Sequence, residues 1–258
     1  MPADSLLVSR TDDILTLTIN RPEKRNALKM ELLDELGASL QGYANDETLK
    51  CAVITAAEDR CFASGGDLKE LDAVRSPNDA EAMSKRGRRA LDQVRQFPLP
   101  VVAGLNGLAF GGGAELAMAC DFRVAVPSAQ IGFLQAQLNV TTAWGGGIDL
   151  IMAIGEQKAL DLLLSSKRLT ADQSYRLGLI DRVCEPAQDL KVCLKEFLQP
   201  YLLSSSRVLR GFKALTIAYR RVMHEKLAAV EQEHFTATWT HPDHWDAVEK
   251  AISGRAKT

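Results

Sequence analysis

The sequence predicts an α/β protein, because short apolar runs of β type alternate with longer segments whose apolar residues recur at helical spacing. Alternation of this kind is typical of βαβ units and therefore of a mostly parallel sheet. Beyond Leu150 the pattern becomes helical, with glycine and proline only near segment ends. A chain of 258 residues that is 46% apolar can bury a full core. We predict an α/β core over residues 1–195 and a helical C-terminal region over residues 196–258.

The first part of the chain predicts a hairpin, a helix and a strand. Leu6–Val8 and Ile14–Ile19 flank a short polar turn, as in an antiparallel hairpin. Apolar residues then recur at helical spacing as far as Tyr43, and Asn26 is a candidate cap for this helix. The apolar run Cys51–Ala56 predicts a buried strand.

A long helix and a short strand follow. One apolar face runs through Asp79–Phe97, and Pro98 with Pro100 ends this helix before the apolar strand Val101–Ala103. No internal repeat or low-complexity linker interrupts the chain. Three later segments have helical character: Leu160–Leu164, Lys191–Leu203 and Val208–Val222.

The overall charge excludes some partners. A net charge of −2 with mixed signs gives no bulk attraction to nucleic acid or to a membrane surface. The sequence starts without a basic, apolar leader and contains no stretch of membrane-span length. We therefore expect a cytoplasmic protein with neither a nucleic-acid nor a membrane partner.

Cysteine and histidine usage predicts no metal site. Five cysteines without a C-x-x-C pair indicate reduced thiols rather than a disulfide framework or a zinc site. All four histidines lie near the C-terminal end, without an H-E-x-x-H signature, and we interpret them as surface or interface residues: His224, His234, His241 and His244.

Three consecutive glycines precede a single carboxylate in Phe110–Asp121. Gly111, Gly112 and Gly113 lead into a short apolar helix, and Glu115 lies in its first turn. The first amides of a helix have no intrahelical partner and carry partial positive charge. The stretch therefore has the composition of an oxyanion hole beside an acid/base residue.

A second glycine turn offers another donor. Gly65 and Gly66 follow the strand Cys51–Ala56 and precede a further helix, within the segment Ala63–Glu70. Two such turns, each after a strand, can direct two amides at one carbonyl oxygen. Either turn alone would be interpreted as a tight strand-to-helix connection. Neither fits a dinucleotide or P-loop pattern.

Four segments resemble the crotonase (enoyl-CoA hydratase/isomerase) family in order and spacing: Asn20–Leu28, Ala63–Glu70, Gly104–Asp121 and Leu169–Val183. The resemblance implies a crotonase-like ββα-spiral core with a helical C-terminal trimerisation region. It also implies an acyl-CoA thioester substrate, a homo-trimer or a hexamer of paired trimers, and no cofactor beyond the CoA moiety of the substrate.

The resemblance also assigns site residues. It makes the amides of Gly66 and Gly112 the oxyanion donors and Glu115 the proton carrier. Lys24, Arg25 and Lys69 are the candidate cations for the CoA phosphates. The remaining CoA-binding candidates lie in the same two motifs, and Asp67 is also a candidate helix cap: Ala27, Ala63, Gly65, Asp67 and Leu68.

One position departs from the family pattern. Hydratases with two glutamates carry the second one in a Gly-x-Pro-Glu segment, and the matching stretch here, Gly132–Gln135, ends in Gln135. A glutamine can hold a water or a carbonyl, but it cannot exchange a proton. The second carboxylate of two-glutamate hydration is therefore missing.

A second departure points to a particular branch of the family. Four features look like animal ethylmalonyl-CoA decarboxylase: Trp144 before a glycine run, the Gly-Gly-Gly-Ala-Glu form, the triplet Asp121–Arg123 and the segment Glu231–Trp239. For Trp144, core packing is an equally open interpretation. The candidate substrate-pocket residues are Gly111, Leu134, Thr142 and Trp144.

These observations rank three candidate functions. Addition–elimination or isomerisation of a 2-enoyl-CoA with the single catalytic glutamate Glu115 comes first, because it is the commonest chemistry of the family. Decarboxylation of a short alkylmalonyl-CoA is the close alternative, since it needs an oxyanion hole and a dry pocket more than two carboxylates. A catalytically silent CoA-binding scaffold is the third possibility. The motif positions leave the acyl chain length open.

Overall fold

A computed structural model describes residues 4–255, and it contains two sheets. The larger sheet has the strand order β1-β2-β3-β5-β7-β10 and the smaller one the order β4-β6-β8-β9. The strands are β1 Leu6–Thr11, β2 Ile14–Ile19, β3 Cys51–Ala56, β4 Cys61–Ala63, β5 Val101–Leu105, β6 Leu108–Phe110, β7 Phe122–Ala125, β8 Gln130–Gly132, β9 Leu169–Thr170 and β10 Arg182–Val183.

The chain alternates between the sheets in ββα units. β3, β5 and β7 lie in the larger sheet, and each is followed directly by a strand of the smaller one, β4, β6 and β8. The predicted hairpin β1–β2 is antiparallel, whereas the remaining pairs of the larger sheet are parallel. The mostly parallel sheet and the spiral core are thus confirmed.

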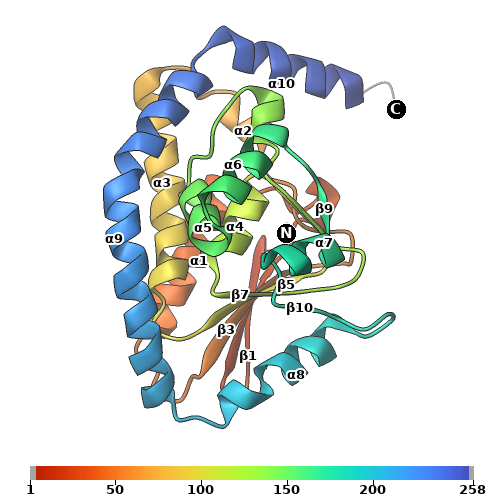
Figure 1. Cartoon of the computed structure of the whole chain (residues 1–258), viewed down its shortest axis with the longest axis vertical. Helices are drawn as coiled ribbons and strands as arrows, with labels where there is room; N and C mark the ends of the chain where they lie inside the picture. The colour runs from red at the N-terminus through yellow and green to blue at the C-terminus, as the bar shows by residue number, and fades with distance from the viewer. Residues whose placement is uncertain (1–3, 256–258) are drawn as a thin grey trace.

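Helices cover the sheets and form the C-terminal region (Figure 1). The predicted helices over residues 79–97, 191–203 and 208–222 are confirmed as α3, α8 and part of α9, except that α3 and α8 each end one residue earlier than predicted. The helices are α1 Met30–Tyr43, α2 Leu68–Leu71, α3 Pro77–Gln96, α4 Gly112–Ala119, α5 Gly146–Ile154, α6 Glu156–Ser165, α7 Ala171–Leu177, α8 Leu190–Leu202, α9 Ser206–Trp239 and α10 Pro242–Arg255, with short 3-10 turns η1 Pro22–Lys24 and η2 Gln135–Leu138.

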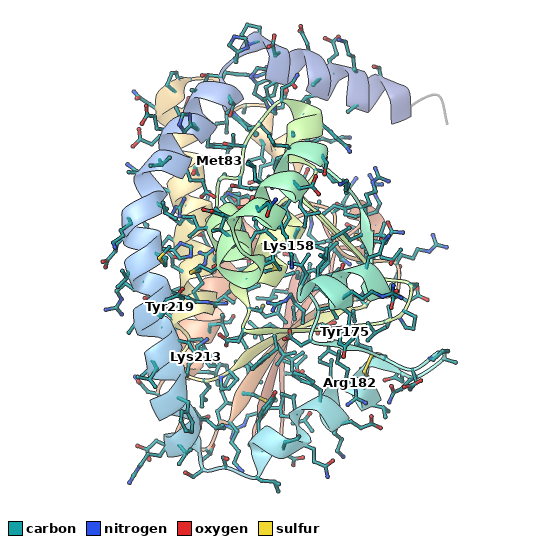
Figure 2. The ribbon with its side chains drawn as sticks, in the orientation of Figure 1. Met83, Lys158, Tyr175, Arg182, Lys213 and Tyr219 are labelled. Atoms are coloured by element: carbon teal, nitrogen blue, oxygen red, sulfur yellow. A yellow bond between two sulfur atoms is a disulfide. The ribbon has the colours of Figure 1, made fainter. Side chains whose placement is uncertain are left out.

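The long helix α9 lies beside α3 along one side of the molecule (Figure 1). Buried polar contacts anchor it: Lys213, labelled in Figure 2, pairs with Asp121 between α4 and β7, and Trp239 Nε1 donates to the Val74 carbonyl at 2.8 Å. The C-terminal region therefore packs on the core of its own chain.

Asn26 is not a helix cap. The helix α1 begins at Met30, after Lys29, and Asn26 lies before it in a left-handed conformation with φ 53°. Its buried side chain accepts from the Arg21 amide at 2.9 Å and donates to the Cys61 carbonyl at 2.6 Å. The residue joins its own loop to the start of β4 instead, a contact that local sequence does not reveal.

The expectation of reduced thiols throughout is wrong. Cys184 and Cys193 form a disulfide, because the chain leaving β10 returns as α8 and brings their Cα atoms to 5.7 Å. Arg182, labelled in Figure 2, lies on the strand that leads into this bond. The other three cysteines are free and buried: Cys51, Cys61 and Cys120.

The assignment of all four histidines to the surface or to an interface is also wrong. His244 on α10 is fully buried, and its Nδ1 lies 2.6 Å from the Leu138 carbonyl of η2. Burial lowers the pKa of His244. Within residues 4–255, no helix is long and apolar enough to cross a membrane, and no group of three or more His, Cys, Asp or Glu could hold a metal ion.

Candidate active site

The two predicted glycine turns touch each other. Gly65 has φ 108° and Gly111 has φ 55°, which are conformations that glycine adopts without strain. A Cβ at Gly65 would lie 3.6 Å from the Gly112 nitrogen, and one at Gly113 would overlap the Ala63 carbonyl oxygen. Glycine is therefore needed at Gly65 and Gly111 for the positive φ, and at Gly113 because a side chain would overlap the Ala63 backbone.

The amides of Gly66 and Gly112 are left free by the secondary structure. Gly66 forms a parallel bridge with Leu28, in which Leu28 donates to the Gly65 carbonyl at 2.8 Å and Asp67 donates to the Leu28 carbonyl at 3.0 Å. This pattern uses the neighbours of Gly66 and not its own N–H. Gly112 is the first residue of α4, where an N–H has no intrahelical partner.

Glu115 is buried and held by the first turn of α5. It is 2% exposed, and its Oε2 accepts from the Trp144 amide at 2.8 Å and from the Gly146 amide at 3.0 Å. A Cβ at Gly146 would overlap the Glu115 side chain. Gly146 therefore makes room for the carboxyl group, and its amide binds the group together with the amide of Trp144.

The surroundings of Glu115 favour exchange of a proton near neutral pH. Burial and the nearby charge of Glu231 raise the pKa of Glu115 to about 7, against the lowering effect of the amides that it binds. Both protonation states are therefore accessible at physiological pH, as an acid/base catalyst requires.

Gln135 lies directly beside Glu115. Its Nε2 donates to Glu115 Oε1 at 3.1 Å, so the position that lacks the second carboxylate is in contact with the first one. The Gln135 Oε1 is buried without a hydrogen-bond partner among residues 4–255. Gln135 can thus orient Glu115 and accept one further hydrogen bond, but it cannot carry a proton.

Trp144 is both packed and part of the site. Its side chain is 4% exposed and lies between the two glycine turns and α3. A Cβ at Gly66 would lie 3.7 Å from Trp144 Cη2, whereas one at Gly112 or Gly87 would overlap the indole. The indole therefore forms a wall directly against both candidate oxyanion glycines.

The other predicted pocket residues lie around this wall. Gly111 donates its amide to the Gly132 carbonyl at 2.9 Å, and Leu134 directly precedes Gln135. Thr142 is buried and hydrogen-bonds to Glu231. The structure thus brings these residues to one region, next to Glu115.

The candidate CoA-binding residues lie on two joined segments. Besides the Leu28–Gly65 bond, Ser64 donates to the Arg25 carbonyl at 3.2 Å, which places residues 24–28 beside residues 63–69. Lys24, Arg25 and Lys69 are exposed and form no salt bridge within the described part of the chain. Ala27, Ala63, Gly65 and Leu68 complete this group.

Asp67 does not cap α2 with its side chain. It precedes Leu68 at the start of that helix, but its carboxylate pairs with Arg21 at 3.0 Å. The Arg21 guanidinium also donates to the Ala27 carbonyl at 2.6 Å. Asp67 therefore ties the two segments together, because a charged partner is within reach.

Sequence reasoning did not assign a role to Glu231. This residue of α9 accepts from the Gly145 amide at 2.8 Å and pairs with Arg88 of α3. It lies 116 positions after Glu115 in the chain, so no local pattern links the two. The signal that could have found it is the resemblance of the segment Glu231–Trp239.

A buried ion cluster supports the same turn from the other side. Arg95 pairs with Asp149 at 2.8 Å and donates to the Trp144 carbonyl at 2.7 Å, while His224 Nε2 lies 3.1 Å from Asp149. Burial opposes ionisation of Asp149, but Arg95 and His224 outweigh it and lower the pKa of Asp149 to about 2. A cavity of about 340 Å³ lies beside this cluster, between α3 and α9.

Comparison with known proteins agrees with this geometry. Residues 9–251 match the family model of enoyl-CoA hydratase/isomerase. Ethylmalonyl-CoA decarboxylase from Xenopus laevis is 31% identical over 237 residues, which cover 91% of this chain and 79% of that protein. Enoyl-CoA isomerase/hydratase fer4 from Mycosarcoma maydis is 37% identical over 207 residues, or 76% of this chain and 74% of that protein.

Solved structures show the same fold. The enoyl-CoA hydratase from Bacillus halodurans superimposes with a TM-score of 0.87, at 23% identity, over 95% of this chain and 99% of that one. Fold, paired glycine turns and buried glutamate together define an acyl-CoA enzyme of the crotonase type. The chain belongs to the enoyl-CoA hydratase/isomerase family.

Proposed function

We propose that the protein decarboxylates a short alkylmalonyl-CoA through a thioester enolate. The observation that carries this proposal is the pair formed by Glu115 and Gln135: one buried carboxyl group contacts an amide where a two-glutamate hydratase has its second carboxylate. The ethylmalonyl-CoA decarboxylases that match over most of the chain support the same choice.

The reaction follows from the free amides and the proton carrier. Cleavage of the bond between the α-carbon and the carboxylate releases CO₂ and leaves its electron pair on the thioester as an enolate. The amides of Gly66 and Gly112 stabilise the negative oxygen. Glu115 in its protonated form then gives its proton to the α-carbon and recovers one from solvent, so that one proton is consumed per turnover.

The packing around Trp144 supports a short acyl group. The indole fills the space between both oxyanion glycines and Gly87 of α3, and 4% of the residue is exposed. An acyl chain seated at the glycine turns would meet this ring within a few carbon atoms. Ethylmalonyl- and methylmalonyl-CoA are the substrates to test first.

A second candidate is hydration or isomerisation of a 2-enoyl-CoA with Glu115 alone. The buried Gln135 Oε1, which lacks a partner among the described residues, favours it because this oxygen could accept from a water molecule. Matches to hydratases, such as a crotonyl-CoA hydratase from Syntrophomonas wolfei at 30% identity, point the same way. A catalytically silent scaffold fits less well, since Glu115 and the free amides are intact.

Incubation with a panel of CoA thioesters separates these functions. The panel contains ethylmalonyl-, methylmalonyl- and crotonyl-CoA, with CO₂ release and product mass as readouts and Glu115→Gln as the control. Decarboxylation predicts CO₂ from the malonyl-type esters. Incorporation of ¹⁸O from water into crotonyl-CoA without CO₂ release would establish hydration, and turnover of neither class would leave a scaffold.

Binding of the CoA moiety is proposed for the segments around Lys24, Arg25 and Lys69. Their exposed cations provide charge for phosphates, while the joined backbones lead to the glycine turns. The substrate brings the CoA group with it, so that no other cofactor is required. Charge reversal at Lys69 should raise KM for CoA esters without an equal loss of kcat.

Self-association is proposed through α9. Its exposed apolar residues recur every three or four positions on one stripe, and Tyr219 among them is labelled in Figure 2: Val208, Phe212, Leu215, Tyr219 and Val222. Such a stripe fits another copy of the chain, in a trimer or a hexamer. Sedimentation of the wild type and of Phe212→Glu tests this proposal.

A cytoplasmic location remains a proposal from the sequence. The Cys184–Cys193 disulfide argues against it, because such bonds are rare in a reducing cytosol. Alkylation of the protein in intact cells, before lysis, tests whether these thiols are free.

A further inference from the structure

Three consecutive amides at the start of α5 are divided between two carboxyl groups from different helices. The amides of Trp144 and Gly146 donate to Glu115 on α4, and the Gly145 amide between them donates to Glu231 on α9 at 2.8 Å. The position of this turn therefore depends on both carboxyl groups at once.

Glu231 is firmly built into this place. Its side chain is 9% exposed, and its Oε1 accepts from the Thr142 hydroxyl at 2.6 Å. Its Oε2 takes the Gly145 amide and pairs with Arg88 of α3. Three elements, α3, α9 and the loop that leads into α5, thus meet at one carboxylate.

We propose that Glu231 is a positioning residue, which holds residues 142–146 in the geometry that binds Glu115 and thereby adjusts its proton transfer. This inference rests on the proposed function only in that Glu115 moves a proton during the reaction. Glu231 itself does not touch the substrate in this account, because the turn lies between it and Glu115.

The charges around Glu115 indicate the direction of the effect. Arg88 and Arg95 come from α3, Asp149 from α5, and His224 and Glu231 from α9. Arg95 and His224 pair with Asp149, whereas Arg88 pairs with Glu231. Burial is the largest cause that raises the pKa of Glu115, and the charge of Glu231 is the second largest.

Two substitutions separate the effect of the charge of Glu231 from the effect of its side-chain length. Glu231→Gln keeps the length and can still accept from the Gly145 amide, but it removes the charge. Glu231→Asp keeps the charge but is one methylene shorter, so that it cannot hold the Gly145 amide and the Thr142 hydroxyl together. Glu233→Gln, an exposed neighbour on the same helix, is the matched control.

Titration of Glu115 by carboxyl ¹³C NMR in the substrate-free enzyme tests the inference, with Glu115→Gln providing the assignment. We expect Glu231→Gln to lower the titration midpoint of Glu115 by roughly one pH unit or more. Glu231→Asp should leave the midpoint high but reduce turnover at least about tenfold, as for a misplaced catalytic group. Glu233→Gln should change neither.

The NMR readout needs no substrate, so it remains valid even if the proposed reaction is wrong. Melting temperatures show whether each variant is folded. The same midpoint in wild type and in folded Glu231→Gln would overturn the role of the charge. Wild-type turnover of Glu231→Asp on the substrate identified by the panel would overturn the role in positioning.

Discussion

Two substitutions of Gly112 can separate the contribution of its backbone amide to catalysis from the effect of packing an added side chain against Trp144. Proline at this position removes the N–H that we assign to the oxyanion hole. Gly112 is the first residue of α4, so its N–H has no intrahelical partner and the helix loses no hydrogen bond. The complication lies in the side chain, since any Cβ at Gly112 overlaps the Trp144 ring.

Alanine at the same position provides the control and the magnitude. Gly112→Ala and Gly112→Pro both push against Trp144, at a cost of about 1–3 kcal/mol for overpacking. Only proline also removes the amide, which is worth about 3–4 kcal/mol in the transition state. We therefore expect kcat of the proline variant to fall about 10²–10³-fold below that of the alanine variant.

The assay measures kcat for CO₂ release from ethylmalonyl-CoA, together with the melting temperature and circular dichroism of both variants. Similar melting temperatures with a large difference in kcat would support the amide as a donor. Equal turnover by two folded variants would refute the assignment of Gly112.

Three further predictions concern the neighbours of this amide. If Glu115 acts as an acid with its pKa raised to about 7, kcat should be at its maximum below pH 7 and should fall as the pH rises through 7. A fall of kcat on the acid side instead would indicate that Glu115 acts as a base. Gln135→Glu places a second carboxylate beside Glu115, so KM for malonyl-type esters should rise through charge repulsion, whereas a gain in crotonyl-CoA hydration would favour the hydratase. Gly87→Ala should lower the melting temperature, because the added Cβ overlaps Trp144 Nε1. This overlap opposes the helix propensity of alanine, which normally stabilises a helix by about 1 kcal/mol relative to glycine. A higher melting temperature would contradict this packing.

The local features of the site could be predicted from the sequence. Gly66, Gly112 and Glu115 lie where their motifs placed them, because a turn between a strand and a helix is specified by a few neighbouring residues. Gln135 also lies beside Glu115, as expected for the position that replaces the second glutamate. The glycine positions with positive φ confirm that these turns require glycine.

Contacts between distant segments could not be predicted in this way. Glu231 reaches the Gly145 amide from α9, and Asn26 joins a loop to the start of β4 rather than capping α1. The pairing of Cys184 with Cys193 spans only nine residues, but it depends on how the chain turns between β10 and α8. Such contacts are set by the packing of whole elements and leave no periodic signal in the chain.

Turnover of ethylmalonyl-CoA in D₂O, with wild type and Glu115→Gln compared by mass spectrometry, tests decarboxylation through an enolate that Glu115 protonates. We expect the wild type to release CO₂ and to place one deuterium on the α-carbon in a single configuration. The Glu115→Gln variant should lose kcat far more than it raises KM. Absence of CO₂ from every malonyl-type thioester, together with addition of solvent oxygen to crotonyl-CoA, would show that the protein is a hydratase and not a decarboxylase.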